Sequence, residues 1–328
     1  MVNEKHWVYR TVIFPRVFTE KSLLYLVGTK RREFLELTEN KSLFYKIDKE
    51  PKKSGGFRDI YKPHWRLKIL LRKINSRVLS RLNFPDFVHC GPSGKSIITA
   101  TRGHNKFKFH ISLDIKSFFD QVSKETTSGI LRKIGINKEI TATIVRAAVE
   151  HDRLPQGFPT SPLLATLVVS YVLQDFYSSF VRKEILISVY ADDILISSNY
   201  KEMLWEAKKY VESELNNVGL SLNTKECFAK NGERFTWLSL QVYPWVTLPR
   251  KELLLLEKVI YKYKETGIVP LDFKPKKIPR EPYDIRELWE ESVKGKVVFA
   301  KSVSHTKLAD KTLKKLDSVK VSSMRKTA

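Results

Sequence analysis

The arrangement of hydrophobic and polar positions along this chain predicts strands and helices. Residues 188–197 place two apolar, β-branched stretches around the adjacent acids Asp192 and Asp193. This pattern predicts a β-hairpin with both acids at its turn. Residues 110–114 form another apolar stretch that ends in an acid, Asp114, and a short turn or helix is expected to follow. Asp114 is therefore expected at the end of a strand.

Longer segments carry apolar residues at helical spacing. In residues 65–82 these alternate with many Arg and Lys, which predicts a helix with one buried and one cationic face. Such a helix suits the wall of a nucleic-acid channel. A basic, proline-broken linker is expected at residues 273–282. Further helical patterns lie at residues 124–150, 161–180, 201–218, 251–263, 285–294 and 306–316.

The acids that end these strands suggest a chemistry. Two like charges at a tight turn repel each other unless a cation lies between them. A solvated surface turn is the alternative, because Asp is a common turn residue. Three carboxylates from neighbouring strands, those of Asp114, Asp192 and Asp193, would supply hard oxygen ligands for a pair of Mg²⁺ ions. Such a pair clamps the attacking and leaving oxygens in phosphoryl transfer, which is polymerase chemistry.

A loop rich in proline and glycine lies between these acids in the chain. Residues 154–162 read Leu-Pro-Gln-Gly-Phe-Pro-Thr-Ser-Pro, and the Thr-Ser pair is a good N-cap sequence for the apolar helix that follows. The order of the Asp114 segment, this loop and the Tyr-Ala-Asp-Asp run at 190–193 resembles motifs A, B and C of reverse transcriptases. The resemblance extends over about residues 45–250, and more faintly into the tail.

The resemblance implies an α+β chain with the right-hand polymerase fold. Its parts are fingers, a palm of antiparallel sheet plus helices, and a small helical thumb. Residues 1–104 would form the amino-terminal segment and fingers, and residues 105–240 the palm with interleaved fingers helices. Residues 241–328 would form the thumb and a basic tail.

The resemblance also assigns the metal site. Asp114, Asp192 and Asp193, helped by the backbone of Ile115, are expected to bind two Mg²⁺ ions, with Mn²⁺ as a substitute. The same three aspartates would be catalytic, together with Lys225. This lysine lies in a segment that resembles motif D, where it would stabilise or protonate the leaving pyrophosphate.

Nucleotide-binding residues follow from the same motifs. A paired-glycine hairpin carries Lys53 and Arg58, and the planar guanidinium of Arg58 would grip the triphosphate bidentately. A solvated basic hairpin is the alternative. Gln156 and Gly157 would shape the nucleotide and template pocket. Phe119 would block the ribose 2′-hydroxyl and so favour deoxynucleotides, unless it is simply a core residue.

A primer-gripping turn is expected near the end of the matched region. Residues 235–240 resemble motif E, which assigns Trp237 and Leu238 to the primer grip. An apolar strand pair in the core is the competing interpretation.

Composition points to partners of the same kind. The 328 residues carry a net charge of +23, which implies a polyanionic partner, and nucleic acid fits best. An RNA template, a DNA product and dNTPs are the expected partners. No long apolar run or concentrated basic amphipathic segment favours a membrane. The first residues lack the apolar core of a signal peptide and there are two cysteines, so a cytoplasmic location is expected.

The size of the chain resembles bacterial retron polymerases and related defence-associated enzymes. This implies a role in antiviral defence, a noncoding RNA as template or scaffold, and an effector or a second reverse transcriptase as protein partner. Two retron signatures are eroded, since residues 100–104 keep only His104 and residues 235–237 read Phe-Thr-Trp. The alternatives are a template-independent or protein-primed DNA polymerase of the same fold, a group II intron-type reverse transcriptase, and an inactive RNA-binding relic.

Overall fold

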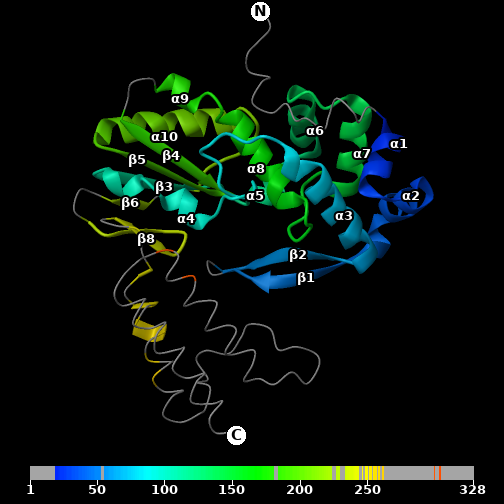
Figure 1. The fold of residues 1–328 in the computed structure, drawn as a ribbon, viewed down its shortest axis with the longest axis horizontal. Helices are drawn as coiled ribbons and strands as arrows, with labels where there is room; N and C mark the ends of the chain where they lie inside the picture. Colours follow the sequence, from blue (N-terminus) through cyan, green and yellow to red (C-terminus); the bar gives the residue numbers. More distant parts are fainter. Residues whose placement is uncertain are drawn as a thin grey trace, which may run out of the picture. The chain divides into compact units, whose positions relative to one another are not determined.

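The computed structural model describes residues 19–52, 55–180, 184–223, 227–229 and 233–243, with isolated residues between 246 and 303 (Figure 1). The chain divides into two compact units. One comprises Met1–Ala100 and Phe107–Asn231, and the other Thr101–Lys106 and Gly232–Ala328. The three-part division expected from the resemblance is not tested by this partition and stays a prediction.

A four-stranded antiparallel sheet forms the centre of the first unit, with the strand order β4-β5-β3-β6. Its strands are β3 (Phe109–Asp114), β4 (Ile185–Tyr190), β5 (Asp193–Ser198) and β6 (Cys227–Ala229). The predicted hairpin at residues 188–197 is confirmed as β4 and β5. Asp193 is the first residue of β5 and pairs with Asp114 across the sheet, so one acid lies in a strand and not in the turn.

Packing on this sheet explains why its strands are apolar. Helix α10 (Lys201–Asn216) contacts β3 and β5 and lies across the strands in Figure 1. It turns toward them a buried stripe at helical spacing, formed by Leu204, Ala207, Val211 and Leu215. The outer edge of β4 is also covered, because the backbone of Val189 exchanges hydrogen bonds of 2.8 and 2.9 Å with Phe87 and His89. A covered edge cannot pair with another chain.

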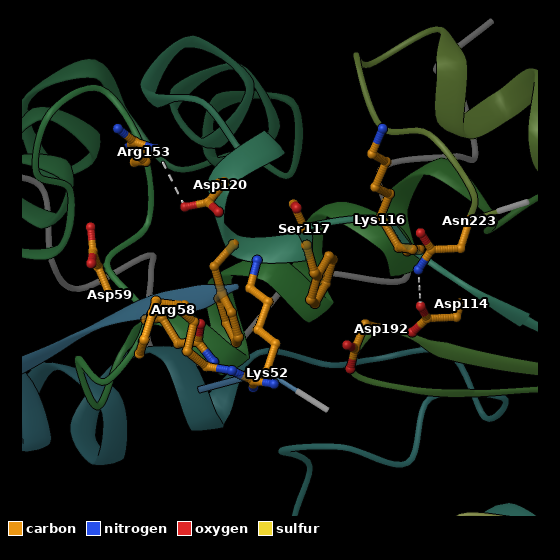
Figure 2. Close-up of a pocket in the computed structure, with 15 residues that line it drawn as sticks. Lys52, Arg58, Asp59, Asp114, Lys116, Ser117, Asp120, Arg153, Asp192 and Asn223 are labelled. Atoms are coloured by element: carbon orange, nitrogen blue, oxygen red, sulfur yellow. Dashed lines mark hydrogen bonds and ion pairs between the residues drawn. The ribbon is translucent and has the colours of Figure 1, made fainter. Parts of the chain in front are cut away.

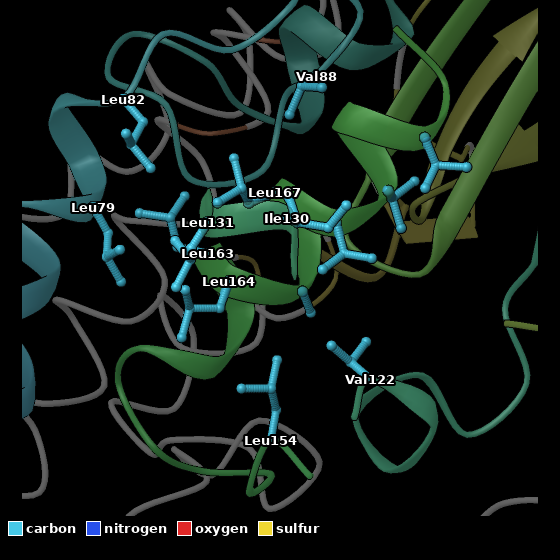
Figure 3. Close-up of a cluster of buried hydrophobic side chains, with 14 of the residues drawn as sticks. Leu79, Leu82, Val88, Val122, Ile130, Leu131, Leu154, Leu163, Leu164 and Leu167 are labelled. Carbon is cyan, nitrogen blue, oxygen red and sulfur yellow. The ribbon is translucent and has the colours of Figure 1, made fainter. Parts of the chain in front are cut away.

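Helix α8 (Ser161–Val172) is surrounded by other elements, and all its residues except Pro162 and Tyr171 are buried. It contacts α5 (Phe118–Gln121), α6 (Lys124–Lys133), η4 (Leu79–Arg81) and α10. Figure 3 shows its leucines among side chains from η4, from α6 and from the segments that connect helices and strands. Each fully buried leucine contributes roughly 1.5–3 kcal/mol, so this helix anchors the first unit. The labelled members are Leu79, Leu82, Val88, Val122, Ile130, Leu131, Leu154, Leu163, Leu164 and Leu167.

The helical patterns at residues 124–150 and 161–180 each correspond to two helices. Helix α6 ends before Gly135, whose φ of +95° no other residue adopts easily, and α7 (Lys138–Ala148) begins at Asn137. The Asn137 side chain caps α7 by accepting a hydrogen bond from the Ile140 amide at 2.9 Å. The second pattern divides into α8 and the short α9 (Phe176–Ser179).

The amino-terminal part of the first unit packs helices beside a hairpin. It contains α1 (Glu20–Val27), α2 (Arg31–Glu39), η3 (Lys41–Phe44), β1 (Tyr45–Pro51), β2 (Phe57–Pro63) and α3 (Trp65–Arg77). The hairpin β1–β2 confirms the turn predicted from the paired glycines. The helix predicted over residues 65–82 is α3 followed by η4. Two of its cations cap another helix, since Lys73 and Arg77 donate to carbonyls at the end of α1.

The second unit contains a short hairpin. Strand β7 (Phe235–Trp237) and strand β8 (Leu240–Tyr243) are joined by Leu238 and Ser239, which have φ of +49° and +64°. Helix η5 (His104–Lys106) contacts β8.

The described residues of 251–263 are helical, whereas the segments 273–282, 285–294 and 306–316 lie outside the described residues. The remaining short helix is α4 (Ile97–Thr101). Across the described residues, no helix is long and apolar enough to span a membrane.

Buried histidines make the stability of this fold depend on pH. Burial lowers the pKa of His89 and of His110 to about 4. The unfolded chain binds these protons near pH 6.5, so each histidine destabilises the fold as the pH falls from 6.5 toward 4. We expect His110 to contribute a loss of about 2 kcal/mol between pH 7 and pH 5. Urea unfolding of the chain at both pH values measures it.

The matched variants isolate this contribution. His110→Asn is expected to weaken the pH dependence even if it lowers stability at both pH values. His151→Asn, which changes a histidine with an exposed side chain, is the control. An unchanged pH dependence in His110→Asn would contradict the assignment.

Candidate active site

Five separate segments of the first unit line one pocket of about 470 Å³ (Figure 2). Asp114 and Asp192 come from the ends of the central strands, Arg58 from β2, Gln156 from the proline-rich loop, and Phe119 from α5. In Figure 2, Asp114 and Asp192 lie at one end of the pocket, together with Asn223. The structure thus brings together residues that the sequence places up to 171 positions apart, from Lys52 to Asn223.

Strand register places the acids. Asp114 is the last residue of β3 and Asp193 the first of β5, and they are partners across the sheet. The turn before β5 contains Ala191, whose φ is +56°. The Ile115 amide donates a 3.0 Å hydrogen bond to the Asp192 carbonyl, which holds the turn against the end of β3. The two motifs are therefore fixed to each other by backbone contacts.

These carboxylates are partly buried and repel one another. Burial is the main cause that raises the pKa of Asp192, while Arg58 opposes the shift. Burial, followed by the charges of Asp192 and Asp114, raises the pKa of Asp193 to about 7. Ionisation of the cluster at neutral pH would therefore be favoured by a nearby cation.

The oxygen donors at this end of the pocket match the metal that the resemblance implies. Carboxylate oxygens are the ligands that Mg²⁺ prefers, and the uncompensated negative charge fits a divalent cation. Asp114 and Asp192 line the pocket, and Asp193 is not among its lining residues. No group of three His, Cys, Asp or Glu side chains within the described residues is arranged to hold a metal ion. The chemistry of the donors fits, and the three-carboxylate site stays a prediction.

A segment after α10 supports Asp114 from the side, and sequence reasoning missed it. The Asn223 side-chain amide donates to the Asp114 carboxylate, and the Asn223 backbone amide donates to the Asp114 carbonyl at 2.8 Å. Two residues earlier, Ser221 accepts from the Lys116 amide and is held by the Gln121 side chain. The only signal in the sequence was the position of Asn223 within the motif D resemblance.

The proline-rich loop is tied to the hairpin that carries Arg58. Gly157 has a φ of +111°, and a Cβ there would lie 2.4 Å from the Tyr61 carbonyl oxygen. The adjacent Gln156 carbonyl accepts a 2.7 Å hydrogen bond from the Tyr61 amide. Close approach of loop and strand therefore requires glycine. The expected cap by Thr160 is absent, and the Ser161 hydroxyl instead donates to the Pro155 carbonyl.

The other end of the pocket holds a second group of charges. Arg153 lies 3.4 Å from Asp120, and Asp59 lies at the same end in Figure 2. Neither Arg153 nor Asp120 was predicted, because no pattern marks them in the sequence. Phe119 lines the pocket, half-buried, with its ring 5.4 Å from that of Phe118. Its role at the sugar stays a prediction.

Several predicted residues are not placed in this pocket. Lys53 and Lys225 lie outside the described residues. Trp237 belongs to the second unit, is 3% exposed and packs its ring 6.3 Å from that of His104. Leu238 lies in the β7–β8 turn. The burial of Trp237 agrees with the core interpretation, and the primer grip stays a prediction.

Comparison with known proteins identifies the family. The family model described as reverse transcriptase (RNA-dependent DNA polymerase) matches residues 50–242, more than half of the chain. The chain belongs to the reverse transcriptase family. The right-hand polymerase fold predicted from motifs A to C is thereby confirmed, because the match contains all three motifs.

The relatives of this reverse transcriptase include bacterial retron proteins. It is 27% identical over 186 residues to the retron Ec86 reverse transcriptase of Escherichia coli, covering 56% of this chain and 57% of that protein. It is 26% identical over 208 residues to the retron Se72 reverse transcriptase of Salmonella heidelberg, covering 62% and 55%. The chain spans about half the length of these curated relatives. The predicted resemblance to the retron class is confirmed.

A solved structure is also similar. Telomerase from Candida tropicalis, truncated from its C-terminal domain, aligns with a TM-score of 0.44 and 16% identity, covering 62% of this chain and 55% of that one.

Removing the Asn223 amide is expected to impair DNA synthesis. Asn223→Ala leaves the Asp114 carboxylate without its side-chain donor, and we expect kcat to fall about 10- to 100-fold with little change in KM for dNTP. Primer extension at several Mg²⁺ concentrations measures both constants. Asn217→Ala, at the exposed end of α10, is the control. Equal kinetics in the two variants would contradict a positioning role for Asn223.

Enlarging Gly157 is expected to separate the loop from the hairpin. Gly157→Ala would force the Tyr61 carbonyl away and displace Arg58 in the same strand. We expect at least about tenfold slower incorporation, since displacements near 1 Å can cost 100-fold. Gly135→Ala also changes a glycine with positive φ but has open space around it, so it controls for strain alone. A similar effect of both variants would exclude the steric explanation.

Proposed function

We propose that this protein is an RNA-directed DNA polymerase that transfers nucleotides with the help of two Mg²⁺ ions. The observation that carries the proposal is that carboxylates and cations line the same pocket in a chain of the reverse transcriptase family. Asp114 and Asp192 lie at one end of that pocket, and the cations Arg58 and Lys52 also line it. Carboxylates for metal and cations for phosphate are the two charges that nucleotidyl transfer requires.

Each residue has a proposed task. Asp114 and Asp192 would hold the metal ions, with Asp193 and the Ile115 backbone in support. Arg58 and Lys52 would bind the triphosphate of the incoming dNTP. The chemistry supplied by bound Mg²⁺ is Lewis-acid activation of the primer hydroxyl and neutralisation of charge on the phosphates.

The rest of the pocket would orient the nucleotide. Phe119 would contact the sugar and disfavour a 2′-hydroxyl. Gln156 and Gly157 would shape the space between the nucleotide and the template. By fixing these groups before the substrate arrives, the fold reduces the entropic cost of aligning the primer with the α-phosphate.

The template is proposed to be a structured or noncoding RNA, and the biological setting a bacterial defence system. The support is the similarity to retron reverse transcriptases, together with a net charge of +23 that suits a nucleic-acid partner. An effector protein or a second reverse transcriptase would complete such a system.

A template-dependence assay tests the central proposal. The purified protein is given labelled dNTPs and Mg²⁺ with a defined RNA template and primer, with a second template of different sequence, or with no template. We expect a DNA product complementary to each template. Product of one fixed or random sequence in all three reactions would instead identify a template-independent polymerase.

Substitution of the acids tests the site. Asp192→Asn is expected to lower incorporation by at least about 1,000-fold, because it removes a charge that the metal and the transition state require. Asp86→Asn makes the same chemical change at an exposed aspartate outside the pocket and should leave the rate unchanged. RNA binding by both variants, measured by anisotropy, confirms that they remain folded. Persistent incorporation by Asp192→Asn would exclude the assignment.

A further inference from the structure

The turn at residues 150–153 contributes to two cavities. Arg153 lines the candidate active site, while Glu150, His151 and Asp152 line a second cavity of about 490 Å³, nearly the same size. The remaining walls of the second cavity come from the end of α2, η3, α6 and α7. A single short turn thus separates this cavity from the proposed catalytic centre.

One charge pair in the second cavity is already satisfied. Lys41 is buried and lies 3.1 Å from the Glu150 carboxylate, and its ammonium also donates to the Val149 carbonyl. Glu150 accepts a further hydrogen bond of 3.1 Å from the Tyr45 hydroxyl. Lys41 and Glu150 therefore neutralise each other and form a rigid wall.

The charges left over are mainly positive. Arg146 lies 3.9 Å from Glu20, but that carboxylate is closer to Arg31, at 3.0 Å. Lys124 forms no ion pair with the part of the chain that the structure describes. Against these two cations stands the carboxylate of Asp152.

The other lining groups suit a compact anion. Ser128 contributes a hydroxyl to the lining, one helical turn after Lys124 on α6, and Ala142 and Val145 contribute apolar walls. Hydrogen bonds from cations to phosphate oxygens are among the strongest that proteins form, and arginine matches phosphate geometry. Phosphate is also the anionic group shared by RNA, DNA and nucleotides, the substrates proposed above.

We propose that this cavity binds a phosphate group outside the catalytic pocket, through Lys124, Arg146 and Ser128. The phosphate belongs either to a nucleic-acid strand or to a free nucleotide. The choice of ligand rests on the proposed function, whereas phosphate binding itself does not require polymerase activity. Binding is therefore measured in EDTA, where DNA synthesis does not occur, so failure of one proposal is distinguishable from failure of the other.

Charge-matched variants provide the test. The double variant Lys124→Ala/Arg146→Ala removes the two cations of the cavity that are proposed to bind the phosphate. The double variant Arg132→Ala/Lys138→Ala removes two exposed cations from the same helices outside the cavity, so the net charge of the two proteins is equal. Thermal unfolding checks that both remain folded.

The first arm measures a short single-stranded RNA by fluorescence anisotropy at several salt concentrations. If the phosphate belongs to a strand, the cavity variant binds RNA at least about fivefold more weakly than the control variant. Its slope of log affinity against log salt is then smaller by about 0.7 for each phosphate that the cavity no longer neutralises.

The second arm measures AMP and inorganic phosphate by calorimetry. If the phosphate belongs to a free nucleotide, these bind the wild type and the control variant but not the cavity variant.

An isosteric variant gives a result of opposite sign. Asp152 has a φ of +57°, which Asn also tolerates, so Asp152→Asn removes the opposing carboxylate without changing the backbone. It is expected to strengthen binding severalfold in whichever arm detects the ligand. Equal behaviour of the two double variants in both arms would overturn the proposal. Weaker binding by Asp152→Asn would overturn it as well, because removing a carboxylate that repels the phosphate cannot weaken phosphate binding.

Discussion

Repulsion between carboxylates at the ends of two neighbouring strands is the constraint around which this reverse transcriptase is built. Antiparallel register places Asp114 opposite Asp193, and a backbone hydrogen bond from Ile115 fixes Asp192 beside them. Burial adds to this cost, because burial first and the charges of Asp192 and Asp114 second raise the pKa of Asp193. Contacts elsewhere in the fold must therefore supply the free energy that holds these acids close together.

The apolar core supplies that stabilisation. Helix α8 is surrounded by other elements, and α10 covers strands β3 and β5, so the acids occupy the end of a sheet whose interior is closely packed. The backbone of residues 221–223 runs along residues 114–116 and adds hydrogen bonds at the point of repulsion. Asn223 acts on Asp114 itself, which gives the carboxylate one preferred orientation before any ligand binds.

The pocket is assembled from segments that meet through backbone contacts. Gly157 allows the proline-rich loop to approach β2, and the Tyr61 amide bonds to Gln156, so the hairpin that carries Arg58 is held against the loop. On the other side, one turn joins the pocket to the cavity lined by Lys124 and Arg146. Because closely packed segments shift together, a displacement of the loop, the hairpin or the turn would also move the segment that it contacts.

The sequence by itself determined the hairpin with its double acid, the strand that ends at Asp114, the paired-glycine hairpin and the family, because apolar β-branched runs, turn residues and three ordered motifs are local signals. It also identified Asp114, Asp192, Arg58 and Gln156, all of which reach one pocket. Only the tertiary structure decided that Asn223 supports Asp114, that Arg153 reaches the pocket, and that Trp237 is buried. These facts depend on contacts between distant segments. A pattern records whether a residue faces inward, but not which partner it meets there.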